Sequence, residues 1–311
     1  MPPIITLTLN PAVDKNTQVE QVVAEDKLRC NAPTREPGGG GLNVSRVIDR
    51  LGEQSTAVYT SGGLTGKMLE SLLDEEAIDH TPLPIDEWTR ENLIVYETST
   101  DRQFRFGMPG PTLTPADVEA CLDALRDTRP APDYLVASGS LPPGAPDDTY
   151  AAVAQAAHAV GARPILDTSG AALRKAMDAG WYLLKPNLRE LQQLADDELE
   201  TEAERIDAAR TFIDRGWCEG VVISMGASGA LLVTPDRAEH VRSPAVPIAS
   251  RVGAGDSMVG GLTAALARGL DLPDAVRFGV AAGAAAVMTP GTELCRRDDT
   301  ERLFEQLRAA A

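Results

Sequence analysis

The sequence predicts an α/β fold in which a mostly parallel central sheet carries helices on both faces. Short aliphatic strand patterns alternate with helix patterns from residue 4 to about residue 288, as in a series of βα units. The chain has 311 residues, which suits one large domain with an appendage. Two regions, 16–36 and 91–107, interrupt the alternation, and we expect them to form a small β-sheet lid beside the core.

The composition is that of a globular protein, with 43% hydrophobic and 24% charged residues. No apolar run approaches the roughly 20 residues that would span a bilayer, and the first residues carry no secretory pattern, so we expect a cytoplasmic protein. The net charge of −17 argues against nucleic acid or an anionic membrane as partner. The four widely spaced cysteines predict neither a disulfide framework nor a zinc site.

The first strand pattern covers residues 4–9 and ends at Asn10-Pro11. Asp14 follows shortly after. Ligands of open α/β sheets collect beyond the carboxyl ends of strands, so Asp14 is a candidate for binding substrate hydroxyls, and the alternative is an ordinary turn aspartate.

The lid regions contain short, charged β-like pieces rather than a long helix. Lys27-Leu28-Arg29-Cys30 is one of them, and residues 93–96 and 103–106 flank Thr100-Asp101 as a hairpin. A sheet of so few strands is marginally stable alone, so we expect it to pack against a second subunit in a homodimer.

A run of four glycines, residues 38–41, leads directly into a helix pattern at 42–48. Such a run costs conformational entropy, and we interpret it as a close approach of backbone to ligand rather than as a flexible hinge. Asn43, in the first turn, offers a side-chain hydrogen bond to that ligand.

The next elements alternate regularly. We predict strands at 57–59, 134–137 and 163–167, and helices at about 65–75, 115–127, 147–159 and from about 170. Another strand ends at Lys185-Pro186-Asn187, where Asn187 and Glu190 share one helix face and could organise a magnesium ion. The same spacing satisfies a capping box, and the residues alone favour the cap.

Residues 220–226 and 229–233 predict two strands joined by a glycine-containing turn. Small residues there leave room for a flat base or a phosphate, although an ordinary hairpin explains them as well.

The stretch Arg251–Met258 joins a glycine turn, a carboxylate and a helix start. Gly253 and Gly255 allow unusual backbone angles, and apolar residues from Met258 onward follow at helix spacing, so unpaired N–H groups should gather around Asp256. Asp256 is either a general base for phosphoryl transfer or a simple charge complement to the helix. Neither a dinucleotide fingerprint nor a Walker loop is present. Helices at 256–268 and 273–288 follow.

Seven blocks, in this order, give the chain a resemblance to the PfkB group of ribokinase-like sugar kinases. They are Thr6-Leu7-Thr8-Leu9-Asn10-Pro11, Lys27-Leu28-Arg29-Cys30, Glu36-Pro37-Gly38-Gly39-Gly40-Gly41, Trp88-Thr89-Arg90, Ser138-Gly139-Ser140-Leu141-Pro142-Pro143-Gly144, Lys185-Pro186-Asn187 and Val252-Gly253-Ala254-Gly255-Asp256-Ser257-Met258. The resemblance implies a ribokinase-like three-layer α/β/α sandwich, formed by a single domain over residues 1–311 with the lid segments inserted.

The resemblance also implies roles for individual residues. Asp256 would be the catalytic base, and the amides of Gly253, Ala254 and Gly255 would form the anion hole. Sugar and its phosphate would be held by Asp14, Lys27, Arg29, Gly39, Gly40, Asn43, Arg90, Arg105 and Ser140. ATP would lie against Lys185, Asn187, Ser224, Gly226 and Gly229. Asn187 and Glu190 would serve magnesium, partly through water, and Ser250, Val252, Ala286 and Gly291 stand where some members bind potassium.

Within the family, relatives that act on fructose 1-phosphate or tagatose 6-phosphate usually carry a lysine in the glycine run. Gly39-Gly40-Gly41 lacks it, which points to the branch that phosphorylates fructose 6-phosphate in glycolysis. The alternatives are a 1-phosphofructokinase, a tagatose-6-phosphate kinase, or a non-catalytic sugar-phosphate sensor on the same fold. For a phosphorylated substrate, an acidic chain should gather Lys27, Arg29, Arg90 and Arg105 around that phosphate.

Overall fold

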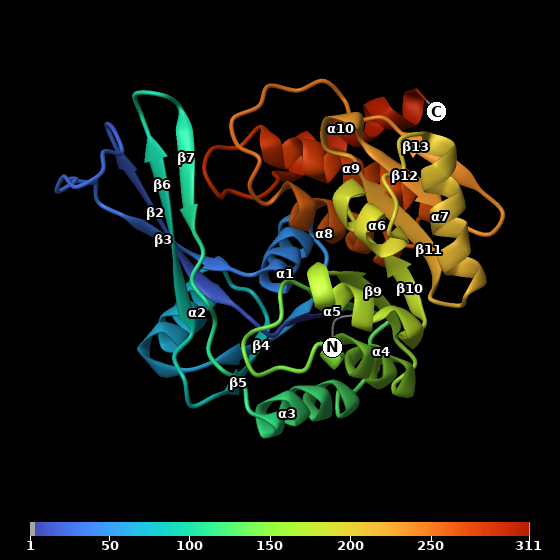
Figure 1. Ribbon diagram of the computed structural model, residues 1–311, viewed down its shortest axis with the longest axis horizontal. Coiled ribbons are helices and arrows are strands. Elements are labelled where there is room, and N and C mark those ends of the chain that lie inside the picture. Colours follow the sequence, from blue (N-terminus) through green and yellow to red (C-terminus); the bar gives the residue numbers. More distant parts are fainter. Residues whose placement is uncertain (1–3, 311) are drawn as a thin grey trace.

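The structure is a computed structural model, and it describes residues 4–310. Met1–Pro3, the start of the segment in which we found no secretory pattern, and Ala311 lie outside the described residues. In the described part, a nine-stranded sheet runs through the middle of the molecule between two helical layers, and a smaller sheet stands to one side (Figure 1). The predicted ribokinase-like sandwich with a small β lid is confirmed.

The large sheet has the strand order β13-β12-β11-β10-β9-β8-β1-β4-β5. Neighbouring strands from β5 to β11 pair in parallel, whereas β12 and β13 are antiparallel additions at one edge. The strands are β1 (Ile4–Thr8), β4 (Thr56–Ser61), β5 (His80–Pro84), β8 (Tyr134–Ser138), β9 (Arg163–Asp167), β10 (Trp181–Leu184), β11 (Cys218–Ser224), β12 (Ala230–Val233) and β13 (Ala238–Val241).

Two apolar clusters fill the space on either face of this sheet. The helices are α1 (Gly40–Arg50), α2 (Gly63–Glu75), α3 (Pro115–Arg126), α4 (Thr149–Ala159), α5 (Gly170–Lys175), α6 (Leu188–Ala195), α7 (Glu202–Asp214), α8 (Ala254–Ala267), α9 (Leu272–Val287) and α10 (Arg297–Ala309). Side chains of α1, α8, α9 and α10 pack on one face, and those of α3, α4, α5, α6 and α7 pack on the other. Among residues 4–310, no helix combines the length and apolar character needed to cross a bilayer.

The small sheet, which we call the lid, has the order β3-β2-β6-β7. It is formed by β2 (Ala12–Val19), β3 (Thr34–Gly38), β6 (Arg90–Glu97) and β7 (Arg102–Phe106), so both regions that interrupt the βα pattern contribute. The predicted hairpin is confirmed, with Leu93 opposite Phe106. β2 and β6 are parallel, which makes the lid a mixed sheet.

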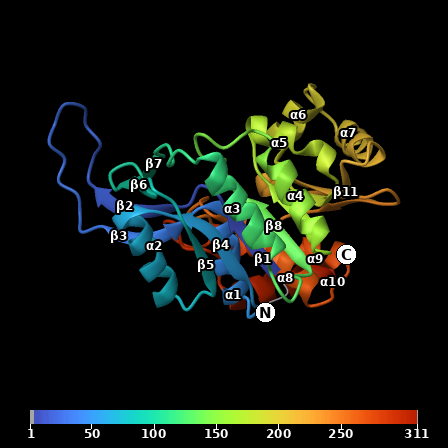
Figure 2. The same ribbon diagram turned by 90° about the horizontal axis from the view of Figure 1, so that it is seen from below.

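The prediction of a β-like piece at Lys27–Cys30 was wrong. Residues 27–30 belong to an exposed loop between β2 and β3, which projects from the lid (Figure 2). Its apolar and charged residues alternate as in a strand, but no neighbouring strand pairs with it in the described chain, and the loop is tied back mainly where Asn31 N–H donates to the Gln18 carbonyl.

Strand register gives the lid two different faces. Residues opposite one another share a face, so Asp14, Asn92 and Arg105 lie on the side that looks toward the core, whereas Leu93 and Phe106 lie on the other. The inner face is therefore mainly polar, with Ile94 as an apolar residue opposite Arg105, and the outer face is partly apolar.

Candidate active site

Asp256 lies in the first turn of α8, as the sequence predicts. Gly253 is the N-cap and has a left-handed φ of 74°, which few other residues adopt without strain. Gly255 instead sits in ordinary helical backbone, so the prediction that it needs a special conformation was wrong. A Cβ built on Gly255 would meet nothing within 4 Å, and its missing side chain thus leaves open space above the helix N-terminus. The first N–H groups of α8 have no acceptors within the helix.

The carboxylate of Asp256 is held by a hydrogen bond from α1. Asn43 Nδ2 donates to Asp256 Oδ2 over 2.8 Å. Protein surrounds Asp256 on most sides, although one edge remains open to solvent, and this burial raises its pKa to about 6. Nearby Asp167 and Asp14 raise the pKa further, whereas the Asn43 bond and the Lys185 charge lower it. A carboxyl group with such a pKa is ionised at neutral pH yet basic enough to accept a proton.

Lys185 brings a positive charge to the same place. It follows β10 and is buried, with Nζ 3.0 Å from Asp167 Oδ1 at the end of β9. Burial acts to lower the pKa of Lys185, but the carboxylates of Asp167, Glu190 and Asp256 outweigh it, and the pKa lies above its ordinary value. Lys185 therefore stays protonated beside the N-terminus of α8. We did not single out Asp167 from the sequence, although its position at the end of a predicted strand was a usable signal.

Asn187 and Glu190 form the capping box that the residues alone favour. Asn187 Oδ1 accepts from Glu190 N–H over 2.9 Å, and Glu190 Oε2 accepts from Asn187 N–H over 2.8 Å. Burial raises the pKa of Glu190, while its bonds to Asn187 and the charge of Lys185 lower it. The cap leaves Glu190 Oε1 free of these bonds. In the described part of the chain, no cluster of three His, Cys, Asp or Glu residues forms a ready-made metal cage.

The glycine run is packed against protein groups. A Cβ on Gly38 would lie 2.5 Å from the Asp14 carboxyl carbon, and one on Gly40 would lie 2.3 Å from Ser138 Oγ. Gly39 caps α1 with φ 116°. The run thus lets α1 begin tight against the ends of β1 and β8. These contacts account for the glycines without a flexible hinge, and they keep Gly39 and Gly40 at the open end of the sheet.

Asp14 lies on the inner face of the lid. Asn92 Nδ2, which the sequence did not reveal as important, donates to Asp14 Oδ1 over 2.8 Å. Burial raises the pKa of Asp14, and the Asn92 bond and the charges of Arg90 and Arg105 lower it. Asp14 also raises the pKa of Asp256, so the lid carboxylate and the carboxylate at the N-terminus of α8 lie near one another.

The structure brings together two of the four expected basic residues. Arg90 and Arg105 both act on Asp14. The Arg90 guanidinium donates to the carbonyls of Asn10 (2.9 Å) and Met108 (3.0 Å), and Asn10 Nδ2 in turn donates to Ser140 Oγ over 3.1 Å.

Lys27 and Arg29 do not join this group within one chain. Both are exposed on the projecting loop between β2 and β3 (Figure 2).

The residues expected to bind ATP lie at one end of the large sheet, where β10 and β11 end and β12 begins. Ser224 ends β11 and pairs with Asn187 as an isolated bridge. Gly226 begins the short 3₁₀ helix Gly226–Ser228, and Gly229 follows it with φ 92°. A Cβ on Gly229 would lie 2.0 Å from the Val241 carbonyl oxygen, so packing against β13 also requires this glycine.

The residues expected to bind potassium lie in two loops near the lid and, in the case of Ala286, in the last turn of α9. Ser250 Oγ donates to the Gly291 carbonyl over 2.6 Å, and Val252 N–H donates to Ser250 Oγ over 3.2 Å. The Ala286 carbonyl accepts from Thr289 Oγ1 over 2.7 Å. This set consists of uncharged oxygens, mostly carbonyls, which is the chemistry that replaces the hydration shell of K⁺.

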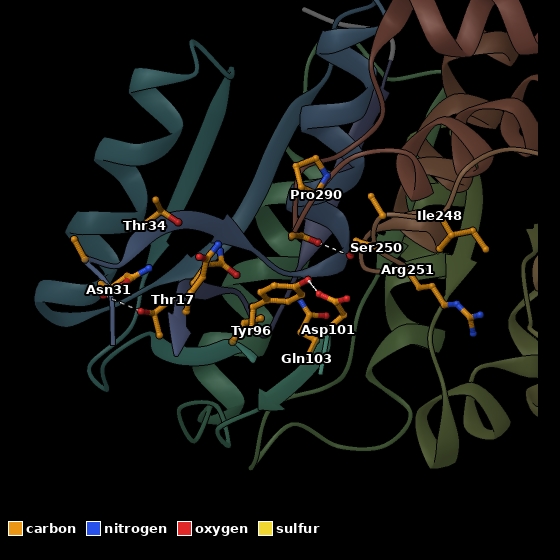
Figure 3. Close-up of a pocket in the computed structure, with 16 residues that line it drawn as sticks. Thr17, Asn31, Thr34, Tyr96, Asp101, Gln103, Ile248, Ser250, Arg251 and Pro290 are labelled. Atoms are coloured by element: carbon orange, nitrogen blue, oxygen red, sulfur yellow. Dashed lines mark hydrogen bonds between the residues drawn. The ribbon is translucent and has the colours of Figure 1, made fainter. Parts of the chain in front are cut away.

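A cavity of about 1050 Å³ lies between the lid and these loops (Figure 3). Neither Asp14, Lys185 nor Asp256 lines it, so this cavity does not contain the catalytic carboxylate candidates. Its walls include Asn16, Gln18, Thr34, Tyr96, Gln103, Ile248, Ser250, Arg251, Pro290 and Gly291.

Comparison with known proteins identifies the family. Residues 7–299 match the model of the pfkB family carbohydrate kinases. The chain belongs to this family. It is 47% identical over 304 residues to the ATP-dependent 6-phosphofructokinase isozyme 2 of Mycobacterium tuberculosis, covering 98% of this chain and 89% of that protein. The PfkB resemblance is thereby confirmed, and the chain is a sugar kinase that uses ATP.

Solved structures of phosphofructokinase-2 from Escherichia coli are also similar. The complex with potassium has a TM-score of 0.95 and 42% identity, and the complex with fructose-6-phosphate has a TM-score of 0.93 and 41% identity. Both matches cover 99% of this chain and 100% of the other. A further structure, with a TM-score of 0.93 and 41% identity over the same shares, is described as the tetrameric inhibited form.

Proposed function

We propose that the chain transfers the γ-phosphoryl group of ATP to the 1-hydroxyl of fructose 6-phosphate, giving ADP and fructose 1,6-bisphosphate. Family membership and the 6-phosphofructokinase relatives support this reaction and its place in glycolysis. The observation that carries it is Asp256, whose pKa of about 6 suits a general base and which lies beside the N–H groups that begin α8.

In this reaction Asp256 accepts the proton of the sugar hydroxyl while the hydroxyl oxygen forms a bond to the γ-phosphorus. The bond from the γ-phosphorus to the bridging oxygen of ADP breaks, and ADP leaves with that electron pair. The N–H groups of Gly253, Ala254 and Gly255 stabilise the charge on the transferred group. Asn43 holds Asp256 in place, and Lys185 offsets phosphate charge.

On the sugar side, we assign Asp14, Asn43, Gly39 and Gly40 to the hydroxyls. Arg90, Arg105 and Ser140 are assigned to the 6-phosphate, because the first two act on Asp14 and the third is linked to Arg90 through Asn10. Lys27 and Arg29 remain assigned to the same phosphate because of the family resemblance and because an acidic chain should gather its basic residues there, and they would have to come from the projecting loop.

On the nucleotide side, we assign Lys185, Asn187, Ser224, Gly226 and Gly229 to ATP. Magnesium fits this site, because the free Glu190 Oε1 and water can hold an ion that the phosphates also bind, with Asn187 as its neighbour. When bound, Mg²⁺ neutralises phosphate charge. We also assign potassium to Ser250, Val252, Ala286 and Gly291, whose oxygens suit it.

The decisive test is a coupled assay of ADP release with a panel of acceptors: fructose 6-phosphate, fructose 1-phosphate, tagatose 6-phosphate, fructose and ribose. We expect the highest kcat/KM with fructose 6-phosphate. Preference for fructose 1-phosphate or tagatose 6-phosphate would transfer the chain to a neighbouring branch of the family. No ADP release with any sugar would favour a non-catalytic sensor.

We further propose that the chain forms a homodimer through its lid. On the outer face Phe106 is 46% exposed, Met108 just after β7 is 45% exposed, and Val23 and Leu28 on the projecting loop are also exposed. An apolar sheet face of this kind is usually covered by a partner. Light scattering should give twice the chain mass, and Phe106→Asp should give monomers. A monomeric wild type at micromolar concentration would contradict the proposal.

The remaining assignments concern organisation and location. We treat residues 1–311 as one kinase domain with the lid segments 16–36 and 91–107 inserted, and limited proteolysis should release no stable smaller unit. We also propose a cytoplasmic location, since ATP and sugar phosphates are available there, and cell fractionation tests it.

A further inference from the structure

Thr292 joins the lid to the body of the protein. This residue is buried in the turn that follows α9, and its hydroxyl donates to Glu36 Oε2 on β3. The Thr292 hydroxyl oxygen, Oγ1, also accepts a 3.0 Å hydrogen bond from Asn16 Nδ2 on β2. One side chain of the body thus binds two strands of the lid, which are more than 250 residues away in sequence.

The turn that carries Thr292 also holds the segment that leads to α8. The carbonyl of Gly291 accepts from Ser250 Oγ over 2.6 Å, as Figure 3 shows beside the cavity. Ser250 Oγ accepts in turn from Val252 N–H over 3.2 Å, and Val252 directly precedes the N-cap Gly253. The backbone N–H groups of Ala249 and Ser250 both donate to the Val287 carbonyl.

These bonds form one continuous set of contacts from β2 and β3 to the N-terminus of α8. The lid carries Asp14, and α8 carries Asp256 and the N–H groups beside it. A shift of the turn 289–293 would therefore change the position of the lid relative to the N-terminus of α8. Because a hydrogen bond to a carboxylate is worth more than one between neutral groups, the Thr292 contact with Glu36 is the strong bond of this set.

We propose that Thr292 is a positioning residue for phosphoryl transfer. It docks the lid on the turn 289–293, and through Gly291 and Ser250 the docked turn fixes the backbone in front of Gly253. Lid position and the orientation of the N–H groups of α8 are then coupled, so that the phosphoryl-binding end of the site is fully ordered only when the lid is docked. The expected effect on phosphoryl transfer rests on the proposed function, but the docking of the lid on the turn 289–293 does not.

The test compares Thr292→Val, which removes the hydroxyl at similar volume, with Thr292→Ser, which keeps it. Thr211→Val is the matched control, because Thr211 is an exposed α7 residue whose hydroxyl bonds only the Asp207 carbonyl. Hydrogen exchange is measured on the full chain without substrates. Thr292→Val should speed exchange by at least about tenfold in β2, β3 and residues 250–255 together, as expected for loss of a charge-assisted bond. Thr292→Ser and Thr211→Val should match the wild type.

Faster exchange confined to 289–293, or equal exchange in Thr292→Val and Thr211→Val, would overturn the proposal. This readout does not depend on the sugar used, so it stands even if the substrate assignment fails. If Thr292→Val does not fold, Asn16→Ala removes one of the two bonds and should give the same pattern with smaller amplitude. An unchanged pattern in Asn16→Ala would count against the coupling.

A kinetic cycle tests the coupling to chemistry. Thr292→Val should lower kcat for the best acceptor by about tenfold, and Thr292→Ser should restore it to within about threefold. Ser250→Ala should also lower kcat. Because both changes act through the same turn, the double variant should lose less than the product of the single losses. A loss equal to that product would show that the two contacts act independently, and would overturn the coupling.

Discussion

The hydrogen bond from Asn43 to Asp256 should set the acid limb of the pH-rate profile. Asn43 Nδ2 lies 2.8 Å from the carboxylate and lowers its pKa, which burial has raised to about 6. Asn43→Ala removes the donor, so burial and the neighbouring carboxylates raise the pKa of Asp256 without this opposing hydrogen bond. A hydrogen bond to a charged group contributes about 1.5–3 kcal/mol, which corresponds to about one to two pKa units.

The pKa of Asp256 in Asn43→Ala should thus rise to about 7–8. A general base works only when deprotonated, so kcat/KM should fall as pH drops through the pKa of Asp256. At pH 7 about nine-tenths of the wild type has the base ionised, whereas a variant with a pKa of about 8 has about one-tenth. The variant should therefore lose most of its activity at pH 7. Raising the pH to 9 should recover the part of the loss that comes from protonation of Asp256, whereas the part that comes from the missing sugar contact of Asn43 should not change with pH.

The assay is kcat/KM between pH 5 and pH 9.5. A sugar phosphate also ionises near pH 6, but that titration is common to all enzymes compared, so only the shift between variants matters. Asn92→Ala is the matched control, because it removes the equivalent bond to Asp14. If the acid limb of the profile stays near pH 6 in Asn43→Ala, or shifts instead in Asn92→Ala, then this limb does not report the ionisation of Asp256.

Three further predictions concern single side chains. Asp256→Asn should lower kcat by about 10²–10⁴-fold. Folding raises the pKa of this carboxyl, so its ionised form destabilises the fold above about pH 6. The variant should therefore unfold at an equal or higher temperature than the wild type at pH 8, and this advantage should disappear below pH 4. Lys185→Met should leave Asp167 without its ion-pair partner and lower the free energy of unfolding by about 3 kcal/mol, measured with urea, whereas Lys185→Arg should lose less, and equal losses would exclude a role for the charge. Arg90→Ala should weaken fructose 6-phosphate by roughly 10–200-fold with little change for ATP, and equal weakening of both would remove Arg90 from the sugar-phosphate site.

Much of the core could be predicted because its signals are local. The apolar strand patterns at β1, β8 and β9 are short; β1 and β8 are buried along their whole length, and β9 is buried at its three central residues. The start of α8 is visible because a left-handed N-cap requires glycine, and Gly253 supplies it. The Asn187–Glu190 cap follows from spacing alone.

The elements that we did not predict have weaker local signals. β5 contains two prolines at a sheet edge, and β13 is a four-residue edge strand with one buried side chain. α10 is exposed along most of its length, with only Leu303 and Phe304 as buried apolar residues. α7 had a readable capping box at Thr201 and Glu204, which we overlooked.

Contacts between distant residues could not be read from the sequence. Lys185 and Asp167 meet because β9 and β10 are neighbours, and Thr292 meets Asn16 and Glu36 because the lid folds against the turn after α9. Neither contact corresponds to a recognisable spacing of residues in the sequence. Lys27 and Arg29 are close in sequence to the lid strands, yet they lie on an exposed loop, so closeness in sequence did not predict their position.

The central place of β1 in the large sheet bears on how the chain folds during synthesis. β1 pairs with β4 and β8, and Ile4 shares an apolar cluster with Met258 and Phe278 of the last helices. About 250 residues separate β1 from those helices, so at about 5–20 residues per second the ribosome needs roughly 12–50 s to complete them. During that time only α1 covers this face of the growing sheet, and the rest of the face stays exposed. Chaperones that shield nascent apolar strands should therefore affect the yield of this protein more than changes at its surface.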